Sequence, residues 1–496
     1  MKKKWLVKIL AFCIAVLFIG TGIASAFNID ESKPSNNGNI FYVGGTGEGN
    51  YTFIQDAIDN ASNGDTVFVY NGTYPNYVRI NKQISLIGEN KNTTIIEGGW
   101  GVLVDIRASY VLVTGFTIRN CGYYYCGGIT IYSYSNNNTI IDNIFIHNIV
   151  GGLMIQGYDN IIVNNSIIDN ARGIGLEDVA HHNIISGNVI ELNNNSGIIL
   201  EFYFPASDNH IVDNIITKNS RGITIINGNN THIEHNLITY NGCGIETFGE
   251  DPTQYKNNTC IENNTIAFNT AGIELVNANN SHIYNNNFLN NTYQGIDEYY
   301  ENPTINNWDN GYPSGGNFWS DYTGSDNYSG PNQDIPGADG IGDIPYDITG
   351  SSKSKDKYPL IKPYGNKPPD SPIFFGPTNG KPGILYNYTV TTTDPNKDNV
   401  SYFIDWGDKT STYLGLYASG EIINVSHKWS KQGVYIINVK AMDFFNYSSK
   451  WVILSVKIPV FVSSKWFYTS FINKYFNTFL NLANILKFKL LCVDNK

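Results

Sequence analysis

The chain has 496 residues, of which 42% are hydrophobic and only 15% are charged, and its formal net charge is −11. This acidic balance argues against nucleic acid and anionic surfaces as partners. The length exceeds that of one ordinary domain, so the chain holds either several domains or a repeat array.

The first 26 residues are typical of a secretory signal peptide. Four lysines within the first eight residues precede the apolar run from Ile9 to Ile19, and Ala24-Ser-Ala26 has the small residues of a cleavage site. Removing this segment leaves 28 basic against 43 acidic residues, a net charge of −15. We therefore predict a secreted cell-surface protein. Its many Asn-x-Ser/Thr acceptors, such as Asn50-Tyr-Thr52, also predict a glycoprotein.

A short amphipathic helix is predicted near residue 55. Thr52-Phe-Ile-Gln55 has the spacing of a capping box, and four apolar residues between Ile54 and Ala61 lie on one helical face. The first strand is expected directly after it, from Thr66 to Val69. A helix in this place would cover the open end of a stacked array of strands.

The stretch from Gly128 to Ile296 repeats one pattern seven times, with a period of 22 to 28 residues. Each pass has two Asn residues five positions apart, an Ile three positions before the first Asn, and an Ile or Phe two positions after it. A Gly followed by an aliphatic residue comes eight or nine positions after the first Asn. Internal repetition at this period indicates a solenoid. The Asn pairs are Asn143/Asn148, Asn165/Asn170, Asn188/Asn193, Asn214/Asn219, Asn236/Asn241, Asn264/Asn269 and Asn286/Asn291.

Each pass of the repeat contains only apolar runs that are too short to form helices. It has three apolar pieces two to four residues long, separated by Asn and Gly, which tolerate left-handed corners. We predict three short β-strands per turn, with Ile columns stacked into a core and Asn columns forming amide ladders. The predicted fold class is therefore all-β, a right-handed parallel β-helix over residues 39–310. The alternative is an αβ solenoid of the leucine-rich type.

Residues 311–365 are rich in Gly, Asp and aromatic residues and are predicted to cap the last turn. Their aromatic side chains, such as those of Gly316-Asn-Phe-Trp-Ser-Asp-Tyr322, would cover the core that the last turn exposes. Four closely spaced acidic side chains suggest a calcium site, because calcium prefers oxygen ligands. These are Asp326, Asp334, Asp339 and Asp343. The alternative is a solvated loop, since the spacing is not that of an EF-hand.

The remainder of the chain divides into a linker, a second domain and a tail. Residues 366–372 are a Pro-rich linker, and the alternating pattern of residues 373–457 predicts an antiparallel β-sandwich. Residues 459–496 have apolar side chains every three or four positions, which predicts an amphipathic helix. Interspersed Asn and Lys make this helix unfit to span a bilayer. We expect it to contact a membrane surface, a partner protein or its own chain.

Several motifs carry a family resemblance. Ile54-Gln-Asp-Ala-Ile58 and Ile84-Ser-Leu-Ile-Gly88 resemble the start of pectate-lyase-like right-handed β-helix proteins. The repeat turns, Asn317-Phe-Trp-Ser-Asp-Tyr322 and Tyr358-Pro-Leu360 resemble the NosD-type β-helix proteins common on archaeal cell surfaces. This resemblance covers about residues 40–363, and it implies the fold without deciding between enzyme and scaffold.

The predicted sandwich resembles a PKD (polycystic kidney disease) domain. The matching pieces are Asp405-Trp-Gly-Asp408, Val425-Ser-His-Lys-Trp429, Gly433-Val-Tyr435 and Ala441-Met-Asp443. The resemblance implies an extracellular adhesive or spacer module without catalysis of its own.

Two candidate sites lie within the repeat. Asp251 stands in Phe248-Gly-Glu-Asp-Pro252, which is similar to a motif of alginate epimerases in which Asp is catalytic. Thr253 replaces the His of that motif, which removes the partner for proton transfer. Four residues occupy the same position on consecutive turns, four residues before the first Asn of each pass. They are His210, His232, Cys260 and His282. Facing outward in one column, they would share a soft metal such as copper or zinc; the alternative is a variable exposed column.

The cysteines suggest one disulfide. Cys121 and Cys126 flank a loop rich in Gly and Tyr and are close enough to pair outside the cell. The odd number of five cysteines in the mature chain leaves at least one thiol outside such a pair.

Taken together, these patterns predict a secreted or envelope-attached surface protein, non-catalytic, that binds polysaccharide or cell-envelope glycan or has a structural role. Calcium is the one cofactor suggested, and nucleic acid is not an expected partner. The alternative is a polysaccharide-modifying β-helix enzyme: a lyase, hydrolase or C5-epimerase. An acidic pair within acid/base reach on one face would favour the enzyme, whereas stacked aromatic and amide side chains without such a pair would favour binding.

Overall fold

The computed structural model describes residues 38–75, 77–98, 101–122, 127–201, 206–226, 228–249, 258–300 and 303–459. The predicted signal peptide, Asp251, Cys126 and the predicted C-terminal helix lie outside these residues. The chain divides into two compact units between Gly365 and Asn366. Within the described part, no helix is both long and apolar enough to cross a membrane.

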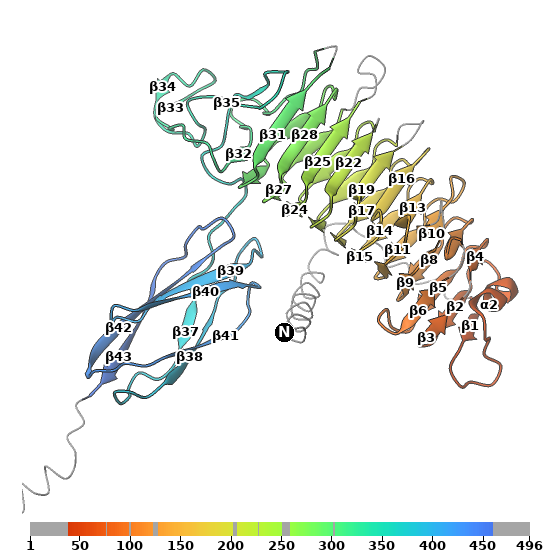
Figure 1. The fold of residues 1–496 in the computed structure, drawn as a ribbon, viewed down its shortest axis with the longest axis horizontal. Helices are drawn as coiled ribbons and strands as arrows, with labels where there is room; N and C mark the ends of the chain where they lie inside the picture. Colours follow the sequence, from red (N-terminus) through yellow and green to blue (C-terminus); the bar gives the residue numbers. More distant parts are fainter. Residues whose placement is uncertain are drawn as a thin grey trace, which may run out of the picture. The chain divides into compact units, whose positions relative to one another are not determined.

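The first unit is a right-handed parallel β-helix, as predicted, and its strands stack from β1 to β31 (Figure 1). Three short strands make each turn, so the chain builds three long parallel sheets, named here sheets A, B and C. Sheet A contains β1 (Ile40–Val43), β2 (Thr66–Val69), β5 (Ser85–Gly88), β8 (Leu112–Thr114), β11 (Thr139–Ile141), β14 (Ile161–Val163), β17 (Ile184–Ser186), β20 (His210–Val212), β23 (His232–Glu234), β26 (Cys260–Glu262) and β29 (His282–Tyr284).

The other two sheets complete each turn. Sheet B contains β3 (Gly72–Tyr74), β6 (Thr94–Glu97), β9 (Thr117–Arg119), β12 (Ile144–Ile146), β15 (Ser166–Ile168), β18 (Val189–Glu191), β21 (Ile215–Thr217), β24 (Leu237–Thr239), β27 (Thr265–Ala267), β30 (Asn287–Leu289) and β32 (Phe318–Trp319). Sheet C contains β4 (Val78–Ile80), β7 (Val104–Ile106), β10 (Gly127–Ile131), β13 (Gly151–Ile155), β16 (Ile174–Glu177), β19 (Ser196–Glu201), β22 (Arg221–Ile226), β25 (Cys243–Phe248), β28 (Ala271–Val276) and β31 (Tyr293–Glu298).

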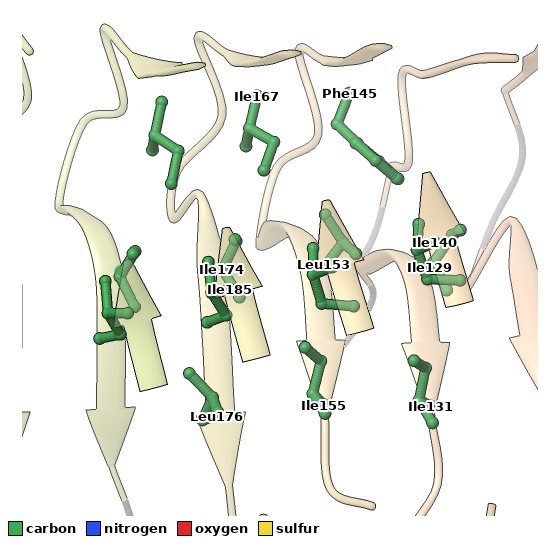
Figure 2. Packing of buried hydrophobic residues seen from close by; sticks show 14 of the residues in the cluster. Ile129, Ile131, Ile140, Phe145, Leu153, Ile155, Ile167, Ile174, Leu176 and Ile185 are labelled. Atoms are coloured by element: carbon green, nitrogen blue, oxygen red, sulfur yellow. The ribbon is translucent and has the colours of Figure 1, made fainter. Parts of the chain in front are cut away.

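The core consists of the predicted aliphatic columns. Ile140 and Ile185 both lie in register with Ile162, between them in sheet A, and all three are fully buried. Figure 2 shows equivalent residues side by side in neighbouring turns, with Phe145 beside Ile167 and Leu153 beside Ile174. Because successive side chains of a strand alternate, burying one position leaves its neighbours free to face outward.

The predicted Asn ladders are confirmed at two corners. Asn143 Nδ2 donates to Asn165 Oδ1 (3.2 Å), and Asn148 Nδ2 donates to Asn170 Oδ1 (2.9 Å); the same bond recurs turn after turn. A third ladder, which the sequence reading did not include, runs through Asn138, Asn160, Asn183 and Asn209. All these side chains are buried, so the amides satisfy one another and the corner backbone.

The left-handed corner residues are not the Asn residues themselves. Positive φ falls on the residue before each ladder Asn, including bulky residues such as Leu192 (60°), Tyr240 (56°) and Phe268 (56°). Such residues adopt this conformation only where the surroundings impose it. The buried Asn that follows supplies that constraint through its bonds to neighbouring turns.

Both ends of the solenoid are closed. At the N-terminal end, helix α2 (Ile54–Asn60) buries Ile54, Ala57 and Ile58 against the first turns. The predicted capping box is wrong: Phe53 is the N-cap and makes no side-chain cap bond. Gln55 instead binds the Asp59 side chain and accepts from the Arg79 backbone N–H, so it ties the helix to strand β4.

The C-terminal cap adds one more strand to the solenoid. β32 pairs with β30, and its Trp319 stacks on Phe288 at 4.3 Å between ring centroids. Two buried carboxylates hold the cap: Asp297 accepts from Trp308 Nε1 (3.1 Å), and Asp356 accepts from Trp319 Nε1 (2.9 Å). Two small hairpins follow, β33 (Tyr328–Ser329) with β34 (Ile335–Pro336), and β35 (Tyr346–Asp347) with β36 (Lys355–Asp356).

The second unit is an antiparallel sandwich, as predicted. Sheet D holds β37 (Ile373–Phe375), β38 (Tyr386–Thr391) and β41 (Ile423–His427); sheet E holds β40 (Ser411–Tyr417), β39 (Val400–Asp405), β42 (Gly433–Met442) and β43 (Val452–Ile458). The sequence pattern did not predict β37 and β40. Trp406, Trp429, Tyr388 and Tyr402 fill the core between the sheets.

Candidate functional site

The outward side chains of sheet C, called here the sheet C face, carry most of the chemistry. The fold uses the inward positions for Ile and the corners for Asn, so only outward positions are free to vary. On the sheet C face, charged residues from different turns come into register. They form three groups between β7 and β28.

The first group on this face surrounds Asp105, which is 1% exposed. Arg107 Nε lies 3.0 Å from both carboxylate oxygens, Arg79 Nε lies 3.5 Å away, and the Tyr77 hydroxyl also donates to this carboxylate. The Arg107 guanidinium lies 4.8 Å from the centroid of the Tyr132 ring. An aromatic ring beside an arginine–carboxylate pair offers both a stacking surface and directed hydrogen bonds.

The second group lies two to four turns further along. Arg172 Nη1 approaches Glu201 Oε2 at 2.9 Å, and Glu201 is in register with Glu177 on the neighbouring turn. Burial raises the pKa of Glu177, although a hydrogen bond from Gln156 opposes this shift. Two carboxylates and one guanidinium therefore share a small area of the face.

The third group has the same composition. Arg221 Nε lies 2.7 Å from Glu246 Oε2, and Glu246 is in register with Glu274. Burial, followed by the charges of Glu246 and Glu298, raises the pKa of Glu274. The two carboxyl groups of the pair thus have different environments, because Arg221 pairs with Glu246 and no ion pair with Glu274 is found among the described residues.

Sequence reasoning missed this pair, although a signal was present. The alignment of turns stopped at the Gly-Ile of each pass, and the next residue is Glu in both Gly244-Ile-Glu246 and Gly272-Ile-Glu274. Arg172 and Arg221 are not on adjacent turns, because β19 lies between β16 and β22.

The predicted His/Cys column lies on sheet A. His210 pairs in register with His232, His232 with Cys260, and Cys260 with His282, and the first two rings stack at 4.9 Å. Burial and then His232 lower the pKa of His210, and burial raises that of Cys260 to about 11. The structure brings the four residues into one column. However, no three His, Cys, Asp or Glu side chains of the described residues are arranged to hold a metal ion, so a metal here stays a prediction.

The predicted calcium loop uses its carboxylates to fold itself. Asp326 accepts from the backbone N–H groups of Asp339 (3.0 Å) and Gly340 (2.9 Å), and Asp339 accepts from that of Ile341. Asp343 accepts from the backbone of Tyr328 and its neighbour Asn327, and these bonds lower its pKa. Asp334 is exposed. Backbone donors therefore occupy oxygens that calcium would need, and calcium at this loop also stays a prediction.

The two remaining predicted sites involve residues outside the described ranges. Asp251 is one of them. Cys121 is buried and its Sγ donates to the Gly101 carbonyl (3.2 Å), while Cys126, its predicted disulfide partner, lies outside.

Sequence reasoning also missed an acidic group in the sandwich. Burial, followed by the charges of Asp394 and Asp443, raises the pKa of Asp398 to about 7. The pKa values of Asp394 and Asp443 are raised as well, and Asn366 Nδ2 donates to Asp443 (2.8 Å). Asp443 is far from Asp394 and Asp398 in the sequence, so only the fold reveals that it is their neighbour.

Comparison with known proteins agrees with both units. Residues 91–260 match the family model for the right handed beta helix region, and residues 202–324 match that for the periplasmic copper-binding protein NosD. The chain is similar to the PKD domain of an M14-like peptidase from Thermoplasmatales archaeon SCGC AB-540-F20, with 49% identity over 19% of this chain and 100% of that chain and a TM-score of 0.19.

Two further solved structures are similar at low identity. One is an alginate lyase from Paenibacillus sp. str. FPU-7, with 14% identity over 56% of this chain and 97% of that chain and a TM-score of 0.35. The other is the enzymatically active domain of tailspike protein 2 from bacteriophage CBA120, with 11% identity over 83% and 74% and a TM-score of 0.40. The search of curated proteins found no match.

Proposed function

Because this chain is a right-handed parallel β-helix protein with NosD-like repeats and a C-terminal PKD-like domain, we propose that it is a secreted or envelope-attached protein that binds polysaccharide on the sheet C face. The PKD-like domain serves as a spacer or adhesive module. The long row of turns matches a chain-like ligand, because a polymer repeats its contacts along the solenoid axis.

One observation carries this proposal: three arginine–carboxylate groups lie along one face of one sheet, centred on Asp105, Glu201 and Glu246. Neighbouring sugar hydroxyls both donate and accept. A guanidinium beside a carboxylate offers the complementary acceptor and donor in a fixed geometry. Exposed tyrosines at both ends of the face, such as Tyr134 and Tyr293, add rings on which sugars can stack.

A substitution of Arg172 tests this proposal. We expect Arg172→Gln to weaken glycan binding at least tenfold, since losing a hydrogen bond to a charged group costs about 1.5–3 kcal/mol and each 1.4 kcal/mol is about tenfold in Kd. The measurement is a glycan array with the wild-type chain, followed by calorimetry of both proteins with the strongest hit.

Arg119→Gln is the matched control, because Arg119 pairs with Glu97 (2.6 Å) on the outer face of sheet B. Its affinity should stay within twofold of wild type. Equal losses in both variants, or a wild-type chain that binds nothing on the array, would refute binding on the sheet C face.

A second function is supported by the Glu246/Glu274 pair. Residues in register on neighbouring parallel strands are about 4.8 Å apart at the backbone. Glycoside hydrolysis uses two carboxyl groups about 5–10 Å apart, one ionised and one able to donate a proton. Arg221 pairs with Glu246 (2.7 Å), and the raised pKa of Glu274 suits a proton donor. The second proposal is therefore hydrolysis of a bound glycan at this pair.

For this second function, we expect Glu274→Gln to lower the rate of chain cleavage about 10²–10⁴-fold, the usual contribution of general acid–base catalysis. The assay follows new reducing ends on the glycans that bind. The control is Glu262→Gln, since Glu262 and Glu234 form an equivalent in-register pair on sheet A. Binding without any cleavage would leave the first proposal intact and remove the second.

A further inference from the structure

The sandwich leaves an apolar surface uncovered on the outer side of sheet E. On β43 the side chains of Val456 and Ile458 point into the core, and the alternate positions point outward. Trp451, just before β43, is 50% exposed and Ile453 is 65% exposed. Tyr413 on β40, at the opposite edge of the sheet, is 60% exposed. Outward positions of an antiparallel sheet are normally polar, so this surface is unusual.

These side chains form one patch, called here the sheet E patch. Phe403 pairs in register with Tyr413 on one side and Lys440 on the other, and its ring lies 6.1 Å from that of Trp451. Lys440 Nζ lies 5.3 Å from the centroid of the Trp451 ring. Next to this aromatic row, Ile453 pairs with Asn438, and Ile436 and Val434 continue the patch along β42. The patch therefore spans all four strands.

The outer side of sheet D is different. Its central strand β38 places Thr389 beside Asn424 of the edge strand β41, and Ser426 donates to the Asn387 side chain. Its exposed large apolar side chains lie on the edge strand β37 (Ile373 and Phe375) and just before β38 and β41 (Leu385 and Ile422). Sheet E differs because its apolar side chains continue across its central strands.

The last described strand of the sandwich, β43, borders this patch. β43 is an edge strand of sheet E and ends at Ile458, and the chain continues through residues 460–496. In that segment apolar residues recur every three or four positions from Phe467 to Leu490, which on a helix gives one apolar face. A helix rises about 1.5 Å per residue and a strand about 3.4 Å. About 22 helical residues therefore match the length of the ten-residue strand β42.

We propose that residues 460–496 fold back as an amphipathic helix whose apolar face covers the sheet E patch. The tether makes this contact intramolecular, so its effective concentration exceeds that of any partner in solution. The aromatic rings of the segment, such as those of Phe471 and Tyr475, pack against Trp451 and Ile453. Lys440 reaches past the helix to solvent with its charged end.

Limited proteolysis of the full chain tests the contact. Trypsin is expected to cut after Lys474 at least tenfold faster in Ile453→Asp than in wild type, because a charge in the patch releases the helix. The control Ile373→Asp changes an equally exposed isoleucine on the edge strand of sheet D. Its cleavage rate should stay within twofold of wild type. Mass spectrometry of timed samples gives the rates.

A second measurement does not depend on any substitution within the sandwich. Hydroxyl-radical labelling of Trp451 and Tyr413 should rise severalfold when the chain is ended at Pro459, while labelling of Phe375 should not change. Three outcomes would overturn the proposal. They are unchanged labelling, protection of Lys474 that grows with protein concentration and so indicates a second copy, and protection that appears only with phosphatidylcholine vesicles.

Discussion

Asn188→Ala is expected to lower the free energy of unfolding of the β-helix by about 3–5 kcal/mol, because each buried polar group left unpaired costs about 1–3 kcal/mol. Asn188 is fully buried. Its Oδ1 accepts from the backbone N–H (2.9 Å) and Nδ2 (3.1 Å) of Asn165, and its Nδ2 donates to the Ile162 carbonyl (2.9 Å) and to Asn214 Oδ1 (3.0 Å). Alanine supplies none of these partners.

Denaturant unfolding of the full chain, followed by circular dichroism, measures this loss. Asn194→Ala is the control, since Asn194 lies six residues further along the same turn with its side chain exposed. Its free energy of unfolding should change by less than about 0.5 kcal/mol, as for other surface substitutions. Equal effects of the two substitutions would mean that the ladder adds nothing to stability beyond its backbone bonds.

The second large effect concerns Asp356, whose side chain is fully buried in the C-terminal cap. Its oxygens accept from the backbone N–H groups of Asn317 (2.7 Å) and Tyr358 (3.0 Å) and from Trp319 Nε1 (2.9 Å). Asp356→Ala leaves three buried donors unpaired and opens a cavity beside Trp319. We expect it to destabilise the cap by about 3–5 kcal/mol.

The same group makes stability depend on pH. Burial raises the pKa of Asp356 from 3.8 to about 7, so the folded chain holds this proton more tightly than the unfolded chain. The contribution of Asp356 to the free energy of unfolding is therefore fully present below about pH 4 and is lost as the pH rises toward 7. The loss is about 4 kcal/mol, at about 1.4 kcal/mol per pKa unit.

Tryptophan fluorescence during unfolding between pH 4 and 8 reports this dependence, because Trp308 and Trp319 both lie in the cap. Wild type should lose stability over this range, and Asp356→Ala should lose much less. Asp347→Ala is the control: Asp347 pairs with Lys355 (2.6 Å) but is 77% exposed, and such surface pairs contribute little. A wild-type chain whose stability rises with pH would contradict the assignment.

The sequence was enough to predict the architecture because the repeat specifies it redundantly. The period, the Ile columns and the Asn pairs all give the same register, and a single slip would move every Ile to the outer side. The position of a residue within the repeat therefore also predicted whether its side chain is buried. It also placed His210, His232, Cys260 and His282 in one outward column, which the structure shows.

The parts that were not predicted are those where no repetition guides the reading. The capping box at Thr52 failed because the Gln55 side chain binds Asp59 within the helix and the Arg79 backbone N–H of strand β4, and no side-chain bond caps the helix N-terminus. The Glu246/Glu274 pair was missed because each Glu stands one residue beyond the Gly-Ile at which the repeated pattern ends. The grouping of Asp394, Asp398 and Asp443 depends on loops of the sandwich that only the fold brings together.

The amide ladders also give the solenoid an electrical direction. Along the two long ladders, each Asn Nδ2 donates one hydrogen bond to the Asn Oδ1 of the next turn, so the amide dipoles point the same way and add, as the peptide dipoles of an α-helix do. The positive end of one ladder reaches the Asp321 carboxylate through Gln294 Nε2 (3.2 Å), and the other ends at Asn317, whose backbone N–H donates to Asp356.

At the opposite end, the negative side of each ladder accepts from a backbone N–H, of Phe116 in one case and Cys121 in the other. The C-terminal end of each ladder is therefore suited to a hydrogen-bond acceptor or a negative charge, and the N-terminal end is suited to a hydrogen-bond donor. Turns can be added or removed within the array without disturbing either end. A cap placed on the wrong end would meet a dipole of the wrong sign.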